Sequence, residues 1–290
     1  MFTTARGGPV RRPCANIELP VQGQPRVYHG RLDNTEDQDP TGGPHVKAAR
    51  HAMKFYCAWY CPFAQRAWMT LLHKALPFDY IEVDPYRESS WWLRISRGRA
   101  LVPVIVQPDT AGRGETTVID STRIVEYLDE LAPGSPPLLP GDANARAELR
   151  FWLDHVNERI VPYMYRFLKA ADAGTERDAS RDALVDGLQA FGEAISPSGR
   201  YFSGTDLTAV DIIMAPFAYR IDVLLDHYRG FAPPTRGEAW AKYRDWYAAA
   251  CELDIFRRTS TDLPDYRERL IEHYRPYSDG GRQADLTQTD

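Results

Sequence analysis

The apolar run Met53-Lys54-Phe55-Tyr56-Cys57-Ala58-Trp59 leads, through Tyr60, into Cys61-Pro62-Phe63-Ala64-Gln65-Arg66. The run predicts a β-strand, and residues 63–74 predict an amphipathic helix. Pro62 then stands at the first helical position, where its missing N–H would have had no partner in any case. Cys61 lies among the unpaired amides of a helix N-terminus, which favour a thiolate over a thiol. The sequence therefore predicts a reactive cysteine of lowered pKa; the alternative is a small buried cysteine beside a turn.

The pattern around this junction continues as a small α/β layer. We expect strands at residues 53–59, 78–83, 104–106 and 116–119, and helices at residues 63–74, 91–95 and 121–131. Strand, helix and strand in this order predict a parallel pair joined by a right-handed crossover. Gly112-Arg113-Gly114 predicts a turn between the last two strands, which would then pair antiparallel.

The second half of the chain has a helical pattern. Residues 132–140 hold five helix breakers and predict a linker, so the first domain would span 53–131 and the second 141–277. We expect a helix over 143–171, kinked or split at Pro162. An apolar stripe at helical spacing, Leu184, Leu188, Phe191 and Ile195, predicts a second helix. The capping signature Thr208-Ala209-Val210-Asp211 predicts the start of a third, and residues 239–250 predict a fourth.

Length and composition restrict the class of protein. The chain has 290 residues, of which 43% are hydrophobic and 26% charged, which is typical of a globular protein of two domains. A net charge of −5 argues against a nucleic-acid partner, and no apolar run is long enough for a membrane span. Four cysteines without regular spacing predict neither a disulfide scaffold nor a metal site, and they suit a reducing, cytoplasmic location.

The two ends of the chain differ from the rest. Residues 1–52 are rich in proline and predict an extended or disordered arm. Arg6, Arg11 and Arg12 precede the first acidic residue, so a targeting segment is an alternative for this arm. The polar residues 278–290 predict a disordered tail.

Three further elements fit a thiol site. A Val-Pro step before a strand, Val102-Pro103, can hold a cis peptide that turns the Val102 backbone towards a peptide-like ligand; the alternative is an ordinary trans proline. Ser121 is a natural N-cap, and with Asp120 it could hold the carboxylate and ammonium of a ligand. Arg87 is a candidate clamp for a second carboxylate; the alternative, a surface ion pair, is the commoner role of a lone arginine.

Together, Cys61-Pro62-Phe63-Ala64-Gln65-Arg66, Leu101-Val102-Pro103, Ile119-Asp120-Ser121, Glu126-Tyr127-Leu128-Asp129 and Leu207-Thr208-Ala209-Val210-Asp211 resemble the glutathione transferase family, and within it the omega class. The resemblance covers about residues 53–275. It implies an α/β thioredoxin-like N-terminal domain followed by an all-α C-terminal domain, and a homodimer. It also implies glutathione as co-substrate, Cys61 as the catalytic residue, and a glutathione site that comprises Phe63, Arg87, Val102, Pro103, Asp120 and Ser121.

The chain departs from the family pattern in three places. Residues 96–100, before the Val-Pro step, replace the usual Asn-Pro-x-Gly with a longer and more basic loop, which puts Arg87 in doubt. Asp120 replaces the commoner Glu and shortens the reach by one methylene group. Ala64 stands where the second cysteine of a Cys-x-x-Cys pair would be, so no such pair exists. Cys57 lies four residues before Cys61, on the predicted strand.

Aromatic residues predict the character of the second substrate. We expect a hydrophobic substrate site built from Trp59, Tyr60, Trp152, Tyr163, Phe217 and Tyr219, which would suit a flat electrophile or a disulfide. Trp91-Trp92 predict surface packing. Three functions stay open: a thiol transferase or dehydroascorbate reductase, a pathway-specific transferase for an aromatic or quinonoid metabolite, and a non-catalytic ligand-binding protein on the same fold.

Overall fold

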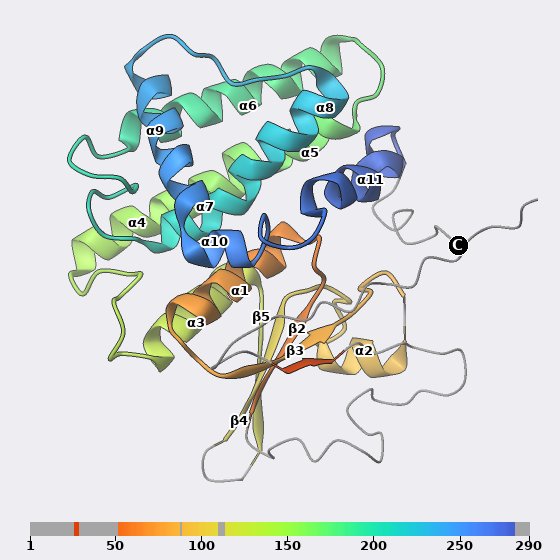
Figure 1. Ribbon diagram of the computed structural model, residues 1–290, viewed down its shortest axis with the longest axis vertical. Helices are drawn as coiled ribbons and strands as arrows, with labels where there is room; N and C mark the ends of the chain where they lie inside the picture. Colours follow the sequence, from red (N-terminus) through yellow and green to blue (C-terminus); the bar gives the residue numbers. More distant parts are fainter. Residues whose placement is uncertain (1–25, 29–51, 88, 110–113, 282–290) are drawn as a thin grey trace, which may run out of the picture.

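The computed structural model describes residues 26–28, 52–87, 89–109 and 114–281 (Figure 1). Its first half is a mixed sheet with helices on both faces, and its second half is helical. The strands are β1 (Arg26–Tyr28), β2 (Met53–Cys57), β3 (Phe78–Glu82), β4 (Val104–Pro108) and β5 (Glu115–Ile119), and the helices of this half are α1 (Pro62–His73), α2 (Ser90–Ile95) and α3 (Ser121–Leu131). The architecture expected from the sequence, α/β followed by all-α, is confirmed.

The sheet has the order β1-β3-β2-β4-β5. Strands β2 and β3 are parallel with Met53 opposite Phe78, and β4 pairs antiparallel with both β2 and β5. The parallel pair and the terminal hairpin are therefore as predicted. Strand β1, which lies within the predicted arm, pairs parallel with β3 and adds an edge strand. The remaining predictions for the arm, those for residues 282–290 of the tail, and Gly112-Arg113 of the predicted turn lie outside the described residues.

Successive side chains of a strand point to opposite faces of the sheet, so neighbouring residues of β2 pack against different helices. Phe55 packs with Tyr80, whose ring also lies 4.9 Å from that of Trp68 on α1. Tyr56 points to the other face, where its ring lies 5.9 Å from that of Trp91 and 5.8 Å from that of Trp92, both on α2. The prediction of surface packing for these two tryptophans is wrong. They are 2% and 1% exposed, because α2 covers this face of the sheet.

The helical half begins after the linker. Its segments are α4 (Ala143–His155), η1 (Val156–Ile160), α5 (Val161–Lys169), α6 (Thr175–Ala194), α7 (Ala209–Arg220), η2 (Ile221–Leu225), α8 (Asp226–Arg229), α9 (Glu238–Glu252), α10 (Asp254–Arg258) and α11 (Tyr266–Ser278). The long helix expected over 143–171 is split, as predicted: the π-helical segment η1 ends two residues before Pro162, which lies in the first turn of α5. Proline cannot supply the N–H that an uninterrupted α-helix requires there.

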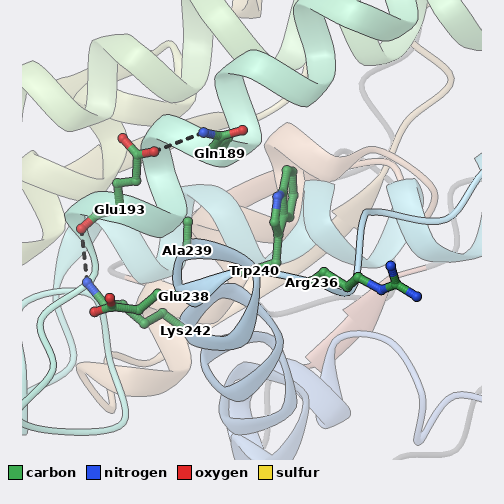
Figure 2. A pocket seen from close by; sticks show the side chains of 8 residues that line it. Gln189, Glu193, Arg236, Glu238, Ala239, Trp240 and Lys242 are labelled. Atoms are coloured by element: carbon green, nitrogen blue, oxygen red, sulfur yellow. Dashed lines mark hydrogen bonds between the residues drawn. The ribbon is translucent and has the colours of Figure 1, made fainter.

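Helices α6 and α9 approach each other closely. A Cβ atom added to Gly192 of α6 would lie 2.4 Å from the carbonyl oxygen of Ala239 on α9, so only glycine allows this approach. Figure 2 shows the start of α9 beside α6, where Lys242 Nζ donates to the carbonyl oxygen of Glu193 at 3.0 Å. The Gln189 amide donates to the Glu193 carboxylate, also at 3.0 Å. The rim of this contact is therefore polar and exposed, over a tightly packed helix pair.

A buried ion pair anchors the linker to the first half of the chain. Lys74 Nζ lies 2.5 Å from Asp129 Oδ1 and donates to the carbonyl oxygen of Pro136 at 2.6 Å. Asp129 also accepts the amide N–H groups of Leu138 and Leu139, at 2.8 and 3.1 Å. These contacts direct the chain from α3 towards α4, and α1 packs against α7 across the junction. Among the described residues, no helix combines the length and apolar character that crossing a membrane requires.

Candidate active site

Cys61 is the N-cap residue of α1, at the end of the loop that follows β2. Its backbone is extended, with φ −79° and ψ 118°, and its amide donates to the carbonyl oxygen of Ala58 at 2.9 Å. Pro62 begins the helix, as predicted, and the Gln65 amide closes the first turn on the Cys61 carbonyl oxygen at 3.0 Å. The strand–helix junction predicted from the sequence is therefore present, with the sulfur beside the first helical amides.

Cys61 opens onto a pocket of about 400 Å³. The residues that line it come from the start of α1, the loop after β3, the loop before β4, the junction of β5 and α3, and the η1–α5 segment. They are Tyr60, Cys61, Phe63, Arg66, Pro85, Tyr86, Ser96, Arg99, Leu101, Val102, Pro103, Ile119, Asp120, Ser121, Thr122, Asn157 and Val161. The Val102-Pro103 peptide is cis, and the Cys61 Sγ lies 3.9 Å from the Val102 carbonyl oxygen. Six of the residues expected to bind glutathione or carry the chemistry thus share one pocket: Cys61, Phe63, Val102, Pro103, Asp120 and Ser121.

The start of α3 is capped differently from the prediction. The N-cap is Asp120, which has φ +76°, and its Oδ1 accepts the amides of Thr122 and Arg123 at 3.1 and 3.2 Å. Aspartate tolerates this left-handed backbone better than most residues, because its short side chain can bond to neighbouring amides. Ser121 is the first helical residue, is buried, and its Oγ accepts a hydrogen bond from Arg66 Nη1 at 3.1 Å. The assignment of Ser121 as N-cap is therefore wrong.

Arg87, the arginine predicted to hold a second carboxylate, lies outside this pocket. Arg87 is exposed and does not line this pocket, whereas Arg99, three residues before Val102, does. Arg99 belongs to the basic loop that distinguishes this chain, and this loop is folded around Ser96. The Ser96 hydroxyl donates to the Trp92 carbonyl oxygen at 2.7 Å and accepts the amide of Ala100 at 3.0 Å. The sequence signal that could have pointed to Arg99 was the basic composition of this loop, because no motif contains this residue.

Two buried arginines flank Cys61, and the sequence interpretation missed both. Arg220 of α7 is fully buried and donates to the carbonyl oxygens of Tyr60 at 2.7 Å and Pro216 at 2.8 Å, and to Gln65 Oε1 at 3.0 Å. Arg66 of α1 packs against the rings of Phe63 and Phe217, with its guanidinium carbon 5.0 and 4.5 Å from their centroids. Arginines within otherwise apolar helical segments were the available signal.

The surroundings of the thiol correct the prediction of a lowered pKa. Burial raises the pKa of Cys61, and this effect outweighs the amides of Ala64 and Phe63 and the charges of Arg220 and Arg66, which lower it. The helix-terminus contribution is therefore present with the predicted sign, but desolvation of the sulfur is larger. In the free protein the thiol form is favoured.

The aromatic residues predicted to form one substrate site are not brought together. Tyr60 lines the pocket, but Phe217 is fully buried behind Arg66. Trp152 donates its indole N–H to Glu148 and packs on Phe202. Trp59 does not line the pocket but packs on the ring of Tyr60 at 5.8 Å and under Arg269. Tyr163 packs under Arg166, and Tyr219 packs on Phe256 and Tyr266. Helical spacing shows on which side of its helix each aromatic residue lies, but it does not show which element packs against that side.

Glu82 holds the loop before Cys61 from behind. Its Oε1 accepts the Trp59 amide at 3.0 Å and its Oε2 accepts the hydroxyl of Tyr80. Burial raises the pKa of Glu82 from 4.5 to about 7, although both hydrogen bonds oppose the shift. The folded chain therefore holds this proton more tightly than the unfolded chain does.

We expect Glu82 to make the free energy of unfolding fall as pH rises from about 4.5 to about 7. Below that window both states are protonated and the stabilising effect is complete; above it the effect is lost, up to about 3 kcal/mol at about 1.4 kcal/mol per pKa unit. Urea unfolding at pH 5 and pH 8 checks this. The unfolding free energy of the wild type minus that of Glu82→Gln should be lower at pH 8 than at pH 5, because glutamine does not titrate; a difference that is the same at both pH values would contradict the prediction.

Comparisons with known proteins agree with this geometry. Residues 55–136 match the family model of the glutathione S-transferase N-terminal domain, and residues 174–249 match that of the C-terminal domain. The chain is 30% identical over 174 residues to "Glutathione S-transferase DHAR3, chloroplastic" of Arabidopsis thaliana, a match that covers 60% of each chain. It is also 30% identical to "Probable glutathione S-transferase DHAR1, cytosolic" of Oryza sativa subsp. japonica, covering 60% of this chain and 73% of that one.

A solved structure supports the same assignment. The chain superimposes on glutathione transferase Omega 3C from Trametes versicolor with a TM-score of 0.64 and 29% identity, covering 78% of this chain and 89% of that one. The two family models fall on the α/β and the helical half, in the order that the structure shows. Glutathione, the co-substrate expected from the sequence, is the co-substrate of this family. The chain belongs to the glutathione S-transferase family.

Proposed function

We propose that this chain is a glutathione-dependent thiol transferase or dehydroascorbate reductase of the cysteine type, in which Cys61 is the nucleophile. The observation that carries the proposal is the place of Cys61: an N-cap sulfur that opens onto a pocket shared with Val102, Asp120 and Ser121. The relatives named for dehydroascorbate reductase activity and the omega-type structural neighbour support the same reaction class.

The proposed reaction has two displacements at sulfur. The Cys61 thiolate attacks the glutathionyl sulfur of a mixed disulfide, forms Cys61–S–S–glutathione and releases the other sulfur as a thiolate. A glutathione thiolate then attacks the glutathionyl sulfur of the enzyme adduct, so that oxidised glutathione leaves and the Cys61 thiolate is regenerated. No second protein thiol is required, which is consistent with Ala64 at the position where a dithiol motif would carry cysteine.

Intact-mass measurement after treatment with oxidised glutathione tests this reaction. We expect a glutathionyl group on Cys61 that excess glutathione removes; peptide mapping distinguishes it from an adduct on Cys14, which lies outside the described residues. Cys57 is fully buried, and burial raises the pKa of Cys251 to about 11, so neither should compete. An unchanged mass together with tight binding of apolar ligands would instead indicate a non-catalytic binding protein.

We expect Asp120 to contribute to glutathione affinity through its charge. Its carboxylate lines the pocket and would meet the ligand's ammonium group. Asp120→Ala should weaken binding by about 1.5–3 kcal/mol, the range for a hydrogen bond to a charged group. Asp120→Asn is the matched variant, because asparagine also caps a helix and tolerates positive φ but carries no charge. Calorimetry should show a similar loss of affinity for both, and full affinity in Asp120→Asn would exclude the ionic contact.

Conjugation of glutathione to an electrophile is a second candidate function. The observation that favours it is the burial that raises the pKa of Cys61 and keeps the protein thiol protonated. Bound glutathione would then be the attacking thiolate, and the aromatic or quinonoid metabolite suggested by the sequence would be its target. A screen of mixed disulfides, dehydroascorbate, haloarenes and quinones separates the two candidates.

The assembly and location of the protein are also part of this proposal. We propose a homodimer in the cytoplasm, whose partners are small molecules and not nucleic acid. Family membership supports the dimer, and the low cysteine content together with the relative named as cytosolic supports the location.

A further inference from the structure

Arg66 is a buried cation that forms no direct ion pair among the described residues, although the charge of the nearby Asp120 carboxylate partly opposes the lowering of its pKa by burial. Its side chain is 1% exposed, and its Nε donates to the carbonyl oxygen of Ile213 at 2.9 Å. Its Nη1 donates to Ser121 Oγ at 3.1 Å, and its Nη2 is buried without a hydrogen-bond partner. Within the described parts of the chain it forms no ion pair. Burial lowers the pKa of Arg66 to about 9, which leaves the guanidinium charged at neutral pH. A buried charge of this kind indicates that an anion belongs nearby.

The hydrogen bond between Arg66 and Ser121 has only one direction. Arginine carries donors and no acceptor, so Ser121 Oγ must accept this bond. The Ser121 hydroxyl hydrogen therefore remains available, and among the described residues it has no acceptor within the protein. Since Ser121 lines the pocket beside Cys61, that hydrogen can be donated to a ligand.

The capping of α3 makes this donor more important. Asp120 Oδ1 already accepts the amides of Thr122 and Arg123, two of the groups that a helix N-terminus would otherwise offer to an anion. For a carboxylate bound at this corner the amide of Ser121, the first residue of α3, remains, and a further donor and a positive charge would strengthen the contact. The Ser121 hydroxyl and the Arg66 guanidinium behind it provide both.

We propose that Arg66 is a positioning residue for glutathione. Arg66 directs the hydrogen of the Ser121 hydroxyl towards the α-carboxylate of the γ-glutamyl group, and its guanidinium supplies the positive charge that balances this carboxylate. The α-carboxylate and the ammonium share one carbon atom, which fits adjacent Ser121 and Asp120. The inference rests on the proposed function, because it takes glutathione as the ligand. It adds a residue that acts through the Ser121 hydroxyl and determines which ligand is preferred.

The test compares glutathione with γ-aminobutyryl-cysteinyl-glycine, which lacks only this α-carboxylate. Calorimetry with the wild type should give at least about a tenfold preference for glutathione, equivalent to about 1.4 kcal/mol. Arg66→Gln and Ser121→Ala should each bind the two peptides with nearly equal affinity. The double variant should lose no more preference than either single variant, since both residues act on one interaction. Arg66→Lys should restore part of the preference.

Arg220→Gln is the matched control, because Arg220 is equally buried and near Cys61 but does not contact Ser121. It should keep the preference for glutathione even if its affinity for both peptides falls. A merely structural role of Arg66 would lower both affinities by the same factor, and that result would overturn the inference. So would a wild type that binds both peptides equally, a result that does not depend on any variant folding. A wild type that binds neither peptide would instead refute the proposed function.

Discussion

Replacement of Cys61 by serine is expected to abolish formation of the mixed disulfide with glutathione and to reduce thiol-transferase turnover by several orders of magnitude. Serine preserves the size of the N-cap side chain, but its hydroxyl does not ionise near neutral pH and forms no disulfide. Glutathione affinity should be largely retained, because Val102, Asp120 and Ser121 are unchanged. Intact mass after treatment with oxidised glutathione, and turnover of a mixed disulfide, measure the two effects.

Cys251→Ser is the control for this variant. Cys251 lies on α9, remote in sequence from the pocket residues, and its thiol is half-buried. This variant should retain both the adduct and the turnover. Full thiol-transferase activity in Cys61→Ser would refute Cys61 as the nucleophile. Conjugating activity that persists or rises in Cys61→Ser would favour the second candidate, because bound glutathione would then be the only thiolate in the pocket.

The corrected pKa of Cys61 adds a pH dependence to this result. Because burial favours the protonated thiol in the free protein, alkylation of Cys61 should keep accelerating as pH rises above the ordinary pKa of a thiol. The sequence alone predicted a lowered pKa for Cys61, which would make alkylation fast already below the ordinary pKa of a thiol. The local contribution, the amides at the start of α1, could be inferred from Pro62 and the helical pattern. The larger contribution depends on the chain that covers the sulfur, which no local motif describes.

The distinction between local patterns and long-range packing also explains which parts of the fold could be predicted from the sequence. Strands β2 to β5, the split at Pro162 and the pocket corner at Asp120 and Ser121 follow from patterns within a few residues, whereas β1 was not predicted. Arg220 contacts the Tyr60 carbonyl oxygen across 160 positions of sequence, so its role beside Cys61 depends on how α7 packs on α1. The misplacement of Trp91, Trp92 and the aromatic substrate site has the same cause. Periodicity shows that a face is apolar, but it does not show what packs against that face.

Asp211 combines a local signature with long-range contacts. The Thr-x-x-Asp capping box predicted at Thr208 is present, with the Thr208 amide and hydroxyl each 2.8 Å from Asp211 Oδ2. The other oxygen, Oδ1, accepts the Phe202 amide and the indole N–H of Trp246, both at 2.8 Å. The carboxylate is fully buried, so it joins α7 to the preceding loop and to α9 through four donors.

We expect Asp211→Ala to lower the free energy of unfolding by at least about 3 kcal/mol, the low end of the summed cost of three orphaned donors. The variant leaves the Phe202 amide, the Thr208 amide and the Trp246 indole buried without acceptors, and each orphaned donor costs about 1–3 kcal/mol. Such a loss is a large fraction of the stability of an ordinary domain. Urea unfolding followed by tryptophan fluorescence and circular dichroism measures it.

Asp142→Ala is the matched control, since Asp142 is also an acid at a helix N-terminus but is exposed. It accepts one amide, that of Ala145, at 2.8 Å, so its loss should cost only about 1 kcal/mol. Asp211→Asn should stay close to the alanine variant, because its amide group would turn donors towards the donors of Thr208 or of Phe202 and Trp246. If Asp211→Ala costs no more than Asp142→Ala, the four contacts do not stabilise the helical half. A cost several times larger, shared by the asparagine variant, requires both carboxylate oxygens as acceptors.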